Sequence, residues 1–119
     1  MSRVPTHLRL QDPGAVADAL ARDVPTRADL KLLSKHFLAV LSIRAPGHSV
    51  EVRVPPYAAV QVVPGVRHTR GTPPAVVEMD AGTWIALATG ELTWHQAEDA
   101  GRVSASGERA DLAPYLPLG

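Results

Sequence analysis

Residues 75–94, AVVEMDAGTWIALATGELTW, change from strand-like to helix-like character within one short stretch. The first five residues are mostly apolar, which is typical of a buried strand. Asp80 then stands at the position of a helix N-cap, and Gly90 at the position just past a helix C-terminus. We therefore expect a strand over 75–79 that leads directly into a helix over 81–89.

The chain on the C-terminal side of this stretch continues with short elements. Thr93 is a predicted N-cap for a second helix over 94–100, which Gly101 ends. A last strand is expected over 102–106, and a final helix over 109–115 follows a Ser-Gly turn. This half of the chain therefore contributes two strands and three helices to the predicted fold.

The longest predicted helix lies nearer the N-terminus, over residues 26–43. Thr26 and Asp29 resemble a capping box, with aspartate in place of the usual glutamate. Apolar residues in this helix recur at spacings of three and four, which is the pattern of one buried helix face: Leu30, Leu33, Phe37, Val40 and Leu41. An earlier, shorter helix is expected to start at Asp12-Pro13, where proline takes the first helical position.

Strand signals follow the long helix. Residues 48–54 alternate between apolar and polar side chains, whereas residues 57–63 are mostly apolar and β-branched. Pro55 and Pro56 separate these two strands, because proline cannot donate a hydrogen bond to a sheet. A short further strand is expected over 66–68. The order of the elements predicts an α+β fold, with an antiparallel sheet and helices gathered on one face.

The composition limits the functions that the chain can have. Its 119 residues suffice for one core, and we expect a single domain, with residues 1–25 as an arm and short helix and residues 26–119 as the core. The lack of cysteine excludes disulfides, thiolate nucleophiles and sulfur-bound zinc. No apolar run approaches the ~18 residues of a membrane span, and the first residues lack an apolar secretory segment. A cytoplasmic protein without an integral membrane segment is expected.

Charge is unevenly distributed along the chain, although the net charge is zero. Residues 1–70 hold ten Lys and Arg against five Asp and Glu, and residues 71–119 hold two against seven. The two halves can neutralise each other in the fold, or the asymmetry can serve a partner, such as a second copy of the chain or an enzyme. Because a basic patch with aromatic residues is missing, no nucleic-acid partner is predicted.

Two parts of the sequence resemble a known family. Residues 76–94, followed by AGRVSASGERADL at 100–112, resemble the C-terminal half of sterol carrier protein type-two domains. VRVPP at 52–56, AVQ at 59–61 and HTRGTPP at 68–74 resemble actinobacterial sterol carrier family proteins. Together these motifs cover roughly two-thirds of the chain, and their order is more specific than any one motif.

The resemblance implies a curved, mostly antiparallel five-stranded sheet with helices covering one face. It also implies an apolar tunnel between the sheet and the helices that takes fatty acyl chains, sterols or similar ligands. Related domains are fused to larger enzymes, including mycothiol-dependent isomerase-like proteins, in which this module is an accessory. We therefore expect the chain to bind an apolar or amphipathic small ligand. The alternative is a non-enzymatic accessory or interaction domain with a filled core.

The best candidate for holding the polar end of such a ligand is the loop that contains His68, Arg70 and Thr72. Arginine offers a planar set of donors that suits a carboxylate or phosphate. Histidine can carry charge near neutral pH, and threonine adds a hydroxyl. The alternative is a structural loop in which Arg70 pairs with Glu78 or Asp80 and orders the entry to the next strand.

Five further residues are candidates for lining the ligand pocket. Arg53 alternates with inward-facing valines, so it lines the pocket mouth or lies on a solvated face. Tyr57 and Gln61 share one face of the second strand and mark either a cavity wall or an edge exposed to water. Phe37 and Trp84 supply apolar walls between the long helix and the sheet, although both equally fit the hydrophobic core.

No catalytic residue, metal or cofactor is predicted. The five histidines lack the spacing of metal ligands, and neither a G-x-S-x-G motif nor a glycine-rich phosphate loop occurs. An enzyme with isomerase-like activity is the least favoured hypothesis, because no nucleophile can be paired with a base.

Overall fold

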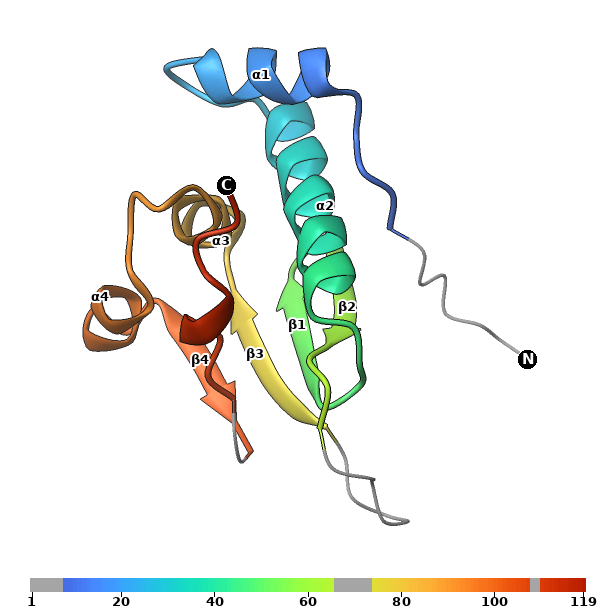
Figure 1. The fold of residues 1–119 in the computed structure, drawn as a ribbon. Helices are drawn as coiled ribbons and strands as arrows, with labels where there is room; N and C mark the ends of the chain where they lie inside the picture. The colour runs from blue at the N-terminus through green and yellow to red at the C-terminus, as the bar shows by residue number, and fades with distance from the viewer. Residues whose placement is uncertain (1–7, 66–73, 108–109) are drawn as a thin grey trace.

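Four strands of the chain pair into one sheet, in the order β2-β1-β3-β4 (Figure 1). The computed structural model describes residues 8–65, 74–107 and 110–119. Its strands are β1 (Val50–Val54), β2 (Ala58–Val62), β3 (Ala75–Met79) and β4 (Val103–Ser106). β1 is antiparallel to β2 but parallel to β3, and β3 is antiparallel to β4. The sheet is therefore mixed, with a parallel pair at its centre.

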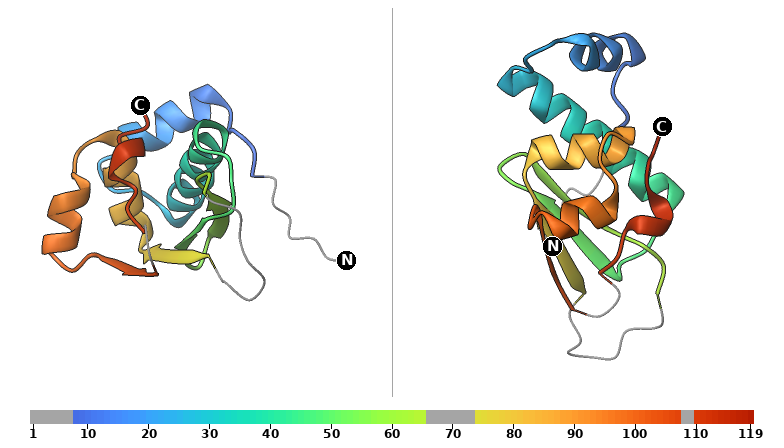
Figure 2. Two further views of the ribbon diagram at one scale, coloured as in Figure 1. Left: turned by 60° about the horizontal axis from the view of Figure 1, so that its bottom comes forward. Right: turned by 90° about the vertical axis from the view of Figure 1, so that its left-hand side faces the viewer.

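The α+β class is confirmed, and two of the three strand pairings are antiparallel, but the expected curved, five-stranded sheet is wrong. The described residues form four strands, and the sheet is not strongly curled (Figure 2). Beyond β2, Val63 has a positive φ of 73° and Pro64 lacks an N–H, so the chain leaves the sheet. It returns beside the start of β1, where the Ala75 N–H donates to the Ser49 oxygen at 3.0 Å. The predicted strand over 66–68 lies outside the described residues.

Helices cover one face of this sheet. α2 (Arg27–Arg44) and α3 (Ala81–Thr89) lie over the same face, and α1 (Pro13–Ala21) crosses the N-terminal end of α2 (Figures 1 and 2). α4 (Trp94–Asp99) packs beside β4. α2 therefore contacts both the sheet and α3, and α1 is added at the N-terminal end of α2.

The burial pattern of the strands explains this one-sided arrangement. In β1, Val50, Val52 and Val54 are buried, whereas Glu51 is half-buried and Arg53 is exposed. Successive side chains of a strand point to opposite faces of a sheet, so apolar residues at every second position create one face that helices must cover. The alternation predicted from the sequence is confirmed.

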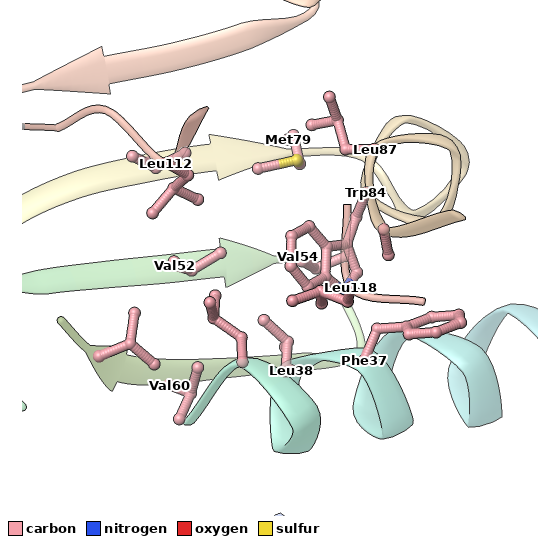
Figure 3. Close-up of a cluster of buried hydrophobic side chains, with 14 of the residues drawn as sticks. Phe37, Leu38, Val52, Val54, Val60, Met79, Trp84, Leu87, Leu112 and Leu118 are labelled. Atoms are coloured by element: carbon pink, nitrogen blue, oxygen red, sulfur yellow. The ribbon is translucent and has the colours of Figure 1, made fainter. Parts of the chain in front are cut away.

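The hydrophobic core lies between the covered sheet face and the helices (Figure 3). Trp84 is fully buried, and its indole N–H donates to the backbone oxygen of Ser34 at 3.3 Å, which joins α3 to α2. The C-terminal segment completes the core, because Leu112 and Leu118 are buried and the Leu118 N–H donates to the Ala88 oxygen at 2.8 Å. Other members of the cluster are Phe37, Leu38, Val52, Val54, Val60, Met79 and Leu87.

Helix capping follows the signals in the sequence. The Thr26 hydroxyl accepts from the Asp29 N–H at 3.0 Å, and the Asp29 carboxylate accepts from the Thr26 N–H at 2.9 Å. Asp80 caps α3 by accepting from the Thr83 N–H at 3.1 Å, and Gly90 follows this helix with a φ of 89°. The predicted starts of α2 and α3 are therefore confirmed.

The final helix predicted over 109–115 is wrong. The described part of that stretch contains only a short 3-10 turn, Ala113–Tyr115. Pro114 lacks the N–H that the carbonyl of Ala110 would need in an α-helix, and the proline ring would clash with that carbonyl. Residues 108 and 109 lie outside the described part of the chain.

Candidate functional site

The loop predicted to hold a polar ligand group, with His68, Arg70 and Thr72, lies outside the described residues. Its role therefore stays a prediction. The two carboxylates named as alternative partners of Arg70 can be placed. Glu78 is exposed on β3, and Asp80 caps the helix that follows.

Arg53 and Tyr57 line a shallow groove of about 350 Å³ at the turn between β1 and β2. The Arg53 guanidinium donates to the Glu51 carboxylate at 3.2 and 3.3 Å, and this contact raises the pKa of Arg53. Arg53 is thus already engaged by a carboxylate of its own strand. The other lining residues are Pro55, Pro56, Ala58, Ala59 and Glu78.

Gln61 does not line this groove. Its amide oxygen lies 3.1 Å from Nδ1 of His48, and its side chain is exposed. Tyr57, in contrast, is half-buried and packs against the core cluster. The structure therefore places these two predicted site residues in different surroundings.

Phe37 and Trp84 belong to the core. Phe37 is 6% exposed and Trp84 is fully buried, and both pack in one cluster with Leu38 and Val60 between the sheet and the helices. In the described part of the chain, the space predicted for a ligand between the long helix and the sheet is occupied by these side chains. A ligand site must therefore be sought at the edges of the helical layer.

A groove between α1, the first half of α2, and α3 has a volume of about 530 Å³, larger than the groove at the β1–β2 turn. We call it the helix groove. Its floor joins the core, because Ala19 and Leu33 are buried, whereas Leu20 on its wall is 44% exposed. The full lining is Ala19, Leu20, Arg22, Asp23, Pro25, Leu30, Leu33, Gly82, Ile85, Ala86, Thr89 and Glu91.

Only one of the charged side chains that line the helix groove forms a salt bridge among the described residues. Nε of Arg22 lies 2.8 Å from Oδ2 of Asp29. The hydrogen bond from the Thr26 backbone N–H, followed by that from Arg22, lowers the pKa of Asp29. Among residues 8–65, 74–107 and 110–119, neither Asp23 nor Glu91 forms a salt bridge. The rim thus carries one arginine that is already paired and two carboxylates that are not.

A second apolar groove, of about 390 Å³, lies between the end of α3, the start of α4 and the C-terminal segment. It is mostly apolar and carries a histidine but no carboxylate or arginine. Its lining residues are Leu87, Gly90, Leu92, Thr93, Trp94, His95, Ala113, Leu116 and Pro117. It is smaller than the helix groove, which combines an apolar floor with charged groups at the rim.

Comparison with known proteins relates this architecture to a family. A family model described as bacterial SCP ortholog matches residues 26–118. The chain belongs to this family. The match confirms the resemblance carried by the sequence motifs, and it covers the sheet, α2, α3 and the C-terminal segment. No curated protein matches the chain.

The helix groove of this bacterial SCP domain has one wall that the family model does not cover. α1, which supplies Ala19 and Leu20, precedes residue 26, whereas α2 and α3 lie within the match. Leu20 lies in the short helix predicted to start at Asp12-Pro13, but no groove was predicted beside that helix. The available signal was that Leu20 and Ile85 are apolar, but core residues carry the same signal.

The parts of this SCP domain that the structure describes contain neither a candidate metal site nor a candidate membrane-spanning helix. No group of three or more His, Asp or Glu side chains there could hold a metal ion. No helix in those parts has both the length and the apolar character needed to cross a bilayer.

His36 connects the N-terminal segment to α2 in a way that depends on its protonation. Its Nδ1 accepts a hydrogen bond from the Gln11 backbone N–H at 3.0 Å, so this nitrogen must be unprotonated. Burial lowers the pKa of His36 below 6.5. The unfolded chain therefore binds the proton more readily than the folded chain, and folding stability should fall as the pH drops below about 6.5.

We expect His36→Asn to flatten this pH dependence, because asparagine can accept the same hydrogen bond but does not titrate. The melting temperature of the wild type should decrease more between about pH 7.5 and 5.5 than that of His36→Asn. His95→Asn, at an exposed position, serves as the control and should keep the wild-type dependence. An equal decrease in wild type and His36→Asn would contradict the assignment.

Proposed function

We propose that this bacterial SCP domain binds an apolar or amphipathic small ligand of the lipid, acyl or sterol-like type, and that it acts by binding rather than by catalysis. The helix groove is the observation that carries the proposal. Its volume of about 530 Å³ lies within the range of roughly 300–1,000 Å³ that is typical of small-molecule sites. Membership of the SCP family supports the same class of ligand.

The apolar floor of the groove provides the driving force for this proposal. Leu30 and Ile85 are half-buried and Leu20 is exposed, so apolar surface remains in contact with water when no ligand is bound. A ligand that removed about 200 Å² of apolar surface from water would gain about 5 kcal/mol, before the costs of ordering and lost freedom. A gain of about 5 kcal/mol corresponds to a dissociation constant of about 0.2 mM, so contacts at the polar rim must add to the affinity as well as provide specificity.

Leu20→Gln is expected to weaken binding of an uncharged long-chain fluorescent probe by about tenfold, because a polar amide replaces apolar surface in the wall. The matched control is Ile43→Gln. Ile43 is also an exposed apolar residue on a helix, at 64% exposure, but it does not line the groove. Fluorescence titration of the three proteins checks the expectation, and equal loss in both variants would place the ligand elsewhere.

One observation favours a second candidate function, that of an accessory or interaction domain. Within residues 8–65, 74–107 and 110–119, the side chains between the sheet and the helices pack in a single buried cluster. Native mass spectrometry of the purified protein separates the two candidates. Retained lipid, or micromolar binding of an acyl or sterol probe, supports the ligand proposal. If neither occurs, and light scattering gives a mass above the 12.6 kDa of one chain, the accessory role is favoured.

A further inference from the structure

We propose that the helix groove selects amphiphiles with a positively charged head group, such as long-chain amines. This inference rests on the proposed function, because it names the class of ligand that the same groove prefers. Three observations support the preference for a positive head group. Two carboxylates in the described lining form no salt bridge, the one arginine there is paired with an aspartate, and the C-terminal ends of two helices meet at the groove.

The two carboxylates come from separate turns. Asp23 follows α1, and Glu91 follows α3, yet both line the same groove. Both residues are exposed, and within the described residues neither forms a salt bridge. A cationic head group at the rim would meet two carboxylates while its chain covered the apolar floor below.

Arg22 does not reverse this preference. It is the only basic side chain in the described lining, and its Nε lies 2.8 Å from the carboxylate of Asp29. That carboxylate also accepts from the Thr26 N–H, so it is fixed in place beside the arginine. Arg22 and Asp29 neutralise one another, which leaves the charge of Asp23 and Glu91 to determine the local potential.

The C-terminal ends of α1 and α3 add to the negative potential at the groove. The last turns of α1 and α3 both line the groove, through Leu20 and Thr89. The C-terminal end of a helix carries partial negative charge on its free carbonyl groups. Two helix N-termini also meet at the groove, that of α2 and, through Gly82, that of α3. Their partial positive charges are matched by carboxylates, Asp29 in the first turn of α2 and Asp80 at the N-cap of α3.

The test uses three ligands with the same chain and different heads: decylamine, decanol and decanoate. Their affinities for the full chain are measured near neutral pH by displacement of the uncharged fluorescent probe. We expect decylamine to bind about fivefold tighter than decanol, and decanoate to bind more weakly than both. The advantage of decylamine should shrink at about 0.5 M sodium chloride, because salt screens charges at an exposed rim.

The double variant Asp23→Asn and Glu91→Gln should remove the advantage of decylamine over decanol, so that the ratio of the two affinities falls to about one. The control is the double variant Glu98→Gln and Asp99→Asn. It removes two exposed carboxylates from α4, outside the groove lining, and should keep the advantage. The readout is the ratio of the decylamine affinity to the decanol affinity. A general loss of affinity would lower both values and leave this ratio unchanged.

Two outcomes overturn the inference in distinguishable ways. If decanol and decylamine both bind but with equal affinity, or if the advantage persists in the groove variant, the charge preference is wrong and the proposed binding function stands. If the probe binds but none of the three ligands displaces it, the inference likewise fails while the binding function stands. If neither the probe nor any of the three ligands binds the full chain, the proposed function fails, and the inference that rests on it fails with it.

Discussion

Trp84→Ala is expected to lower the free energy of unfolding by about 3–5 kcal/mol. Trp84 is fully buried, and it connects α3 to α2 through the hydrogen bond from its indole N–H to the Ser34 oxygen. Alanine would leave a cavity at the junction of helix and sheet, because the surrounding strands and helices can close it only in part. Urea denaturation followed by far-ultraviolet circular dichroism measures the change.

Val24→Ala is the control for this prediction. Val24 is 80% exposed, and an exposed truncation typically changes stability by less than about 0.5 kcal/mol. Trp84→Phe should fall between the two, because it keeps an aromatic ring in the core but loses the indole donor. A Trp84→Ala loss no larger than that of Val24→Ala would show that the core does not depend on this side chain.

Gly47→Ala is expected to destabilise the protein by about 2–4 kcal/mol, through a clash between backbone segments rather than through lost core volume. A Cβ atom at Gly47 would overlap the carbonyl group of Val63, where the chain leaves β2. Val63 cannot withdraw freely, because its N–H donates to Ala45 at 2.6 Å and its oxygen accepts from the Ser49 N–H at 3.1 Å. Thermal unfolding measures the effect.

Gly101→Ala separates this clash from the cost of the backbone angle alone. Gly47 has a φ of 154° and Gly101 a φ of 69°, but a Cβ at Gly101 would meet nothing within 4 Å among the described residues. Its replacement should cost about 1 kcal/mol, which is the usual penalty for a left-handed conformation. Equal losses at Gly47 and Gly101 would show that the contact with Val63 is not the cause.

Local signals in the sequence predicted the local structure well, because each signal acts within a few residues. The capping residues Thr26 and Asp80 mark helix starts that the structure confirms, and Gly90 marks a helix end. The parallel centre of the sheet was not predictable in this way. It depends on where the chain goes after Pro64, and strand alternation indicates which face is buried but not which strand is the neighbour.

The candidate site was harder to predict than the fold, because it belongs to no single motif. The helix groove combines residues 19–25, 30–33 and 82–91, which become neighbours only when the three helices pack. The sequence shows that Leu20 and Ile85 are apolar, but the same pattern describes core residues such as Phe37 and Trp84. Only the gap between the helices distinguishes a wall of the groove from the interior of the core.

The position of α1 outside the region matched by the family model has a consequence for how ligand preference can diverge. α1 has one buried residue, Ala19, so most of its surface can change without disturbing the interior. Substitutions in α1 and the turn after it can alter the wall and rim of the groove while the sheet, α2 and α3 remain the same. Five of the twelve residues that line the groove precede residue 26, so under the proposed binding function new specificities can arise by variation of one short helix and the turn after it.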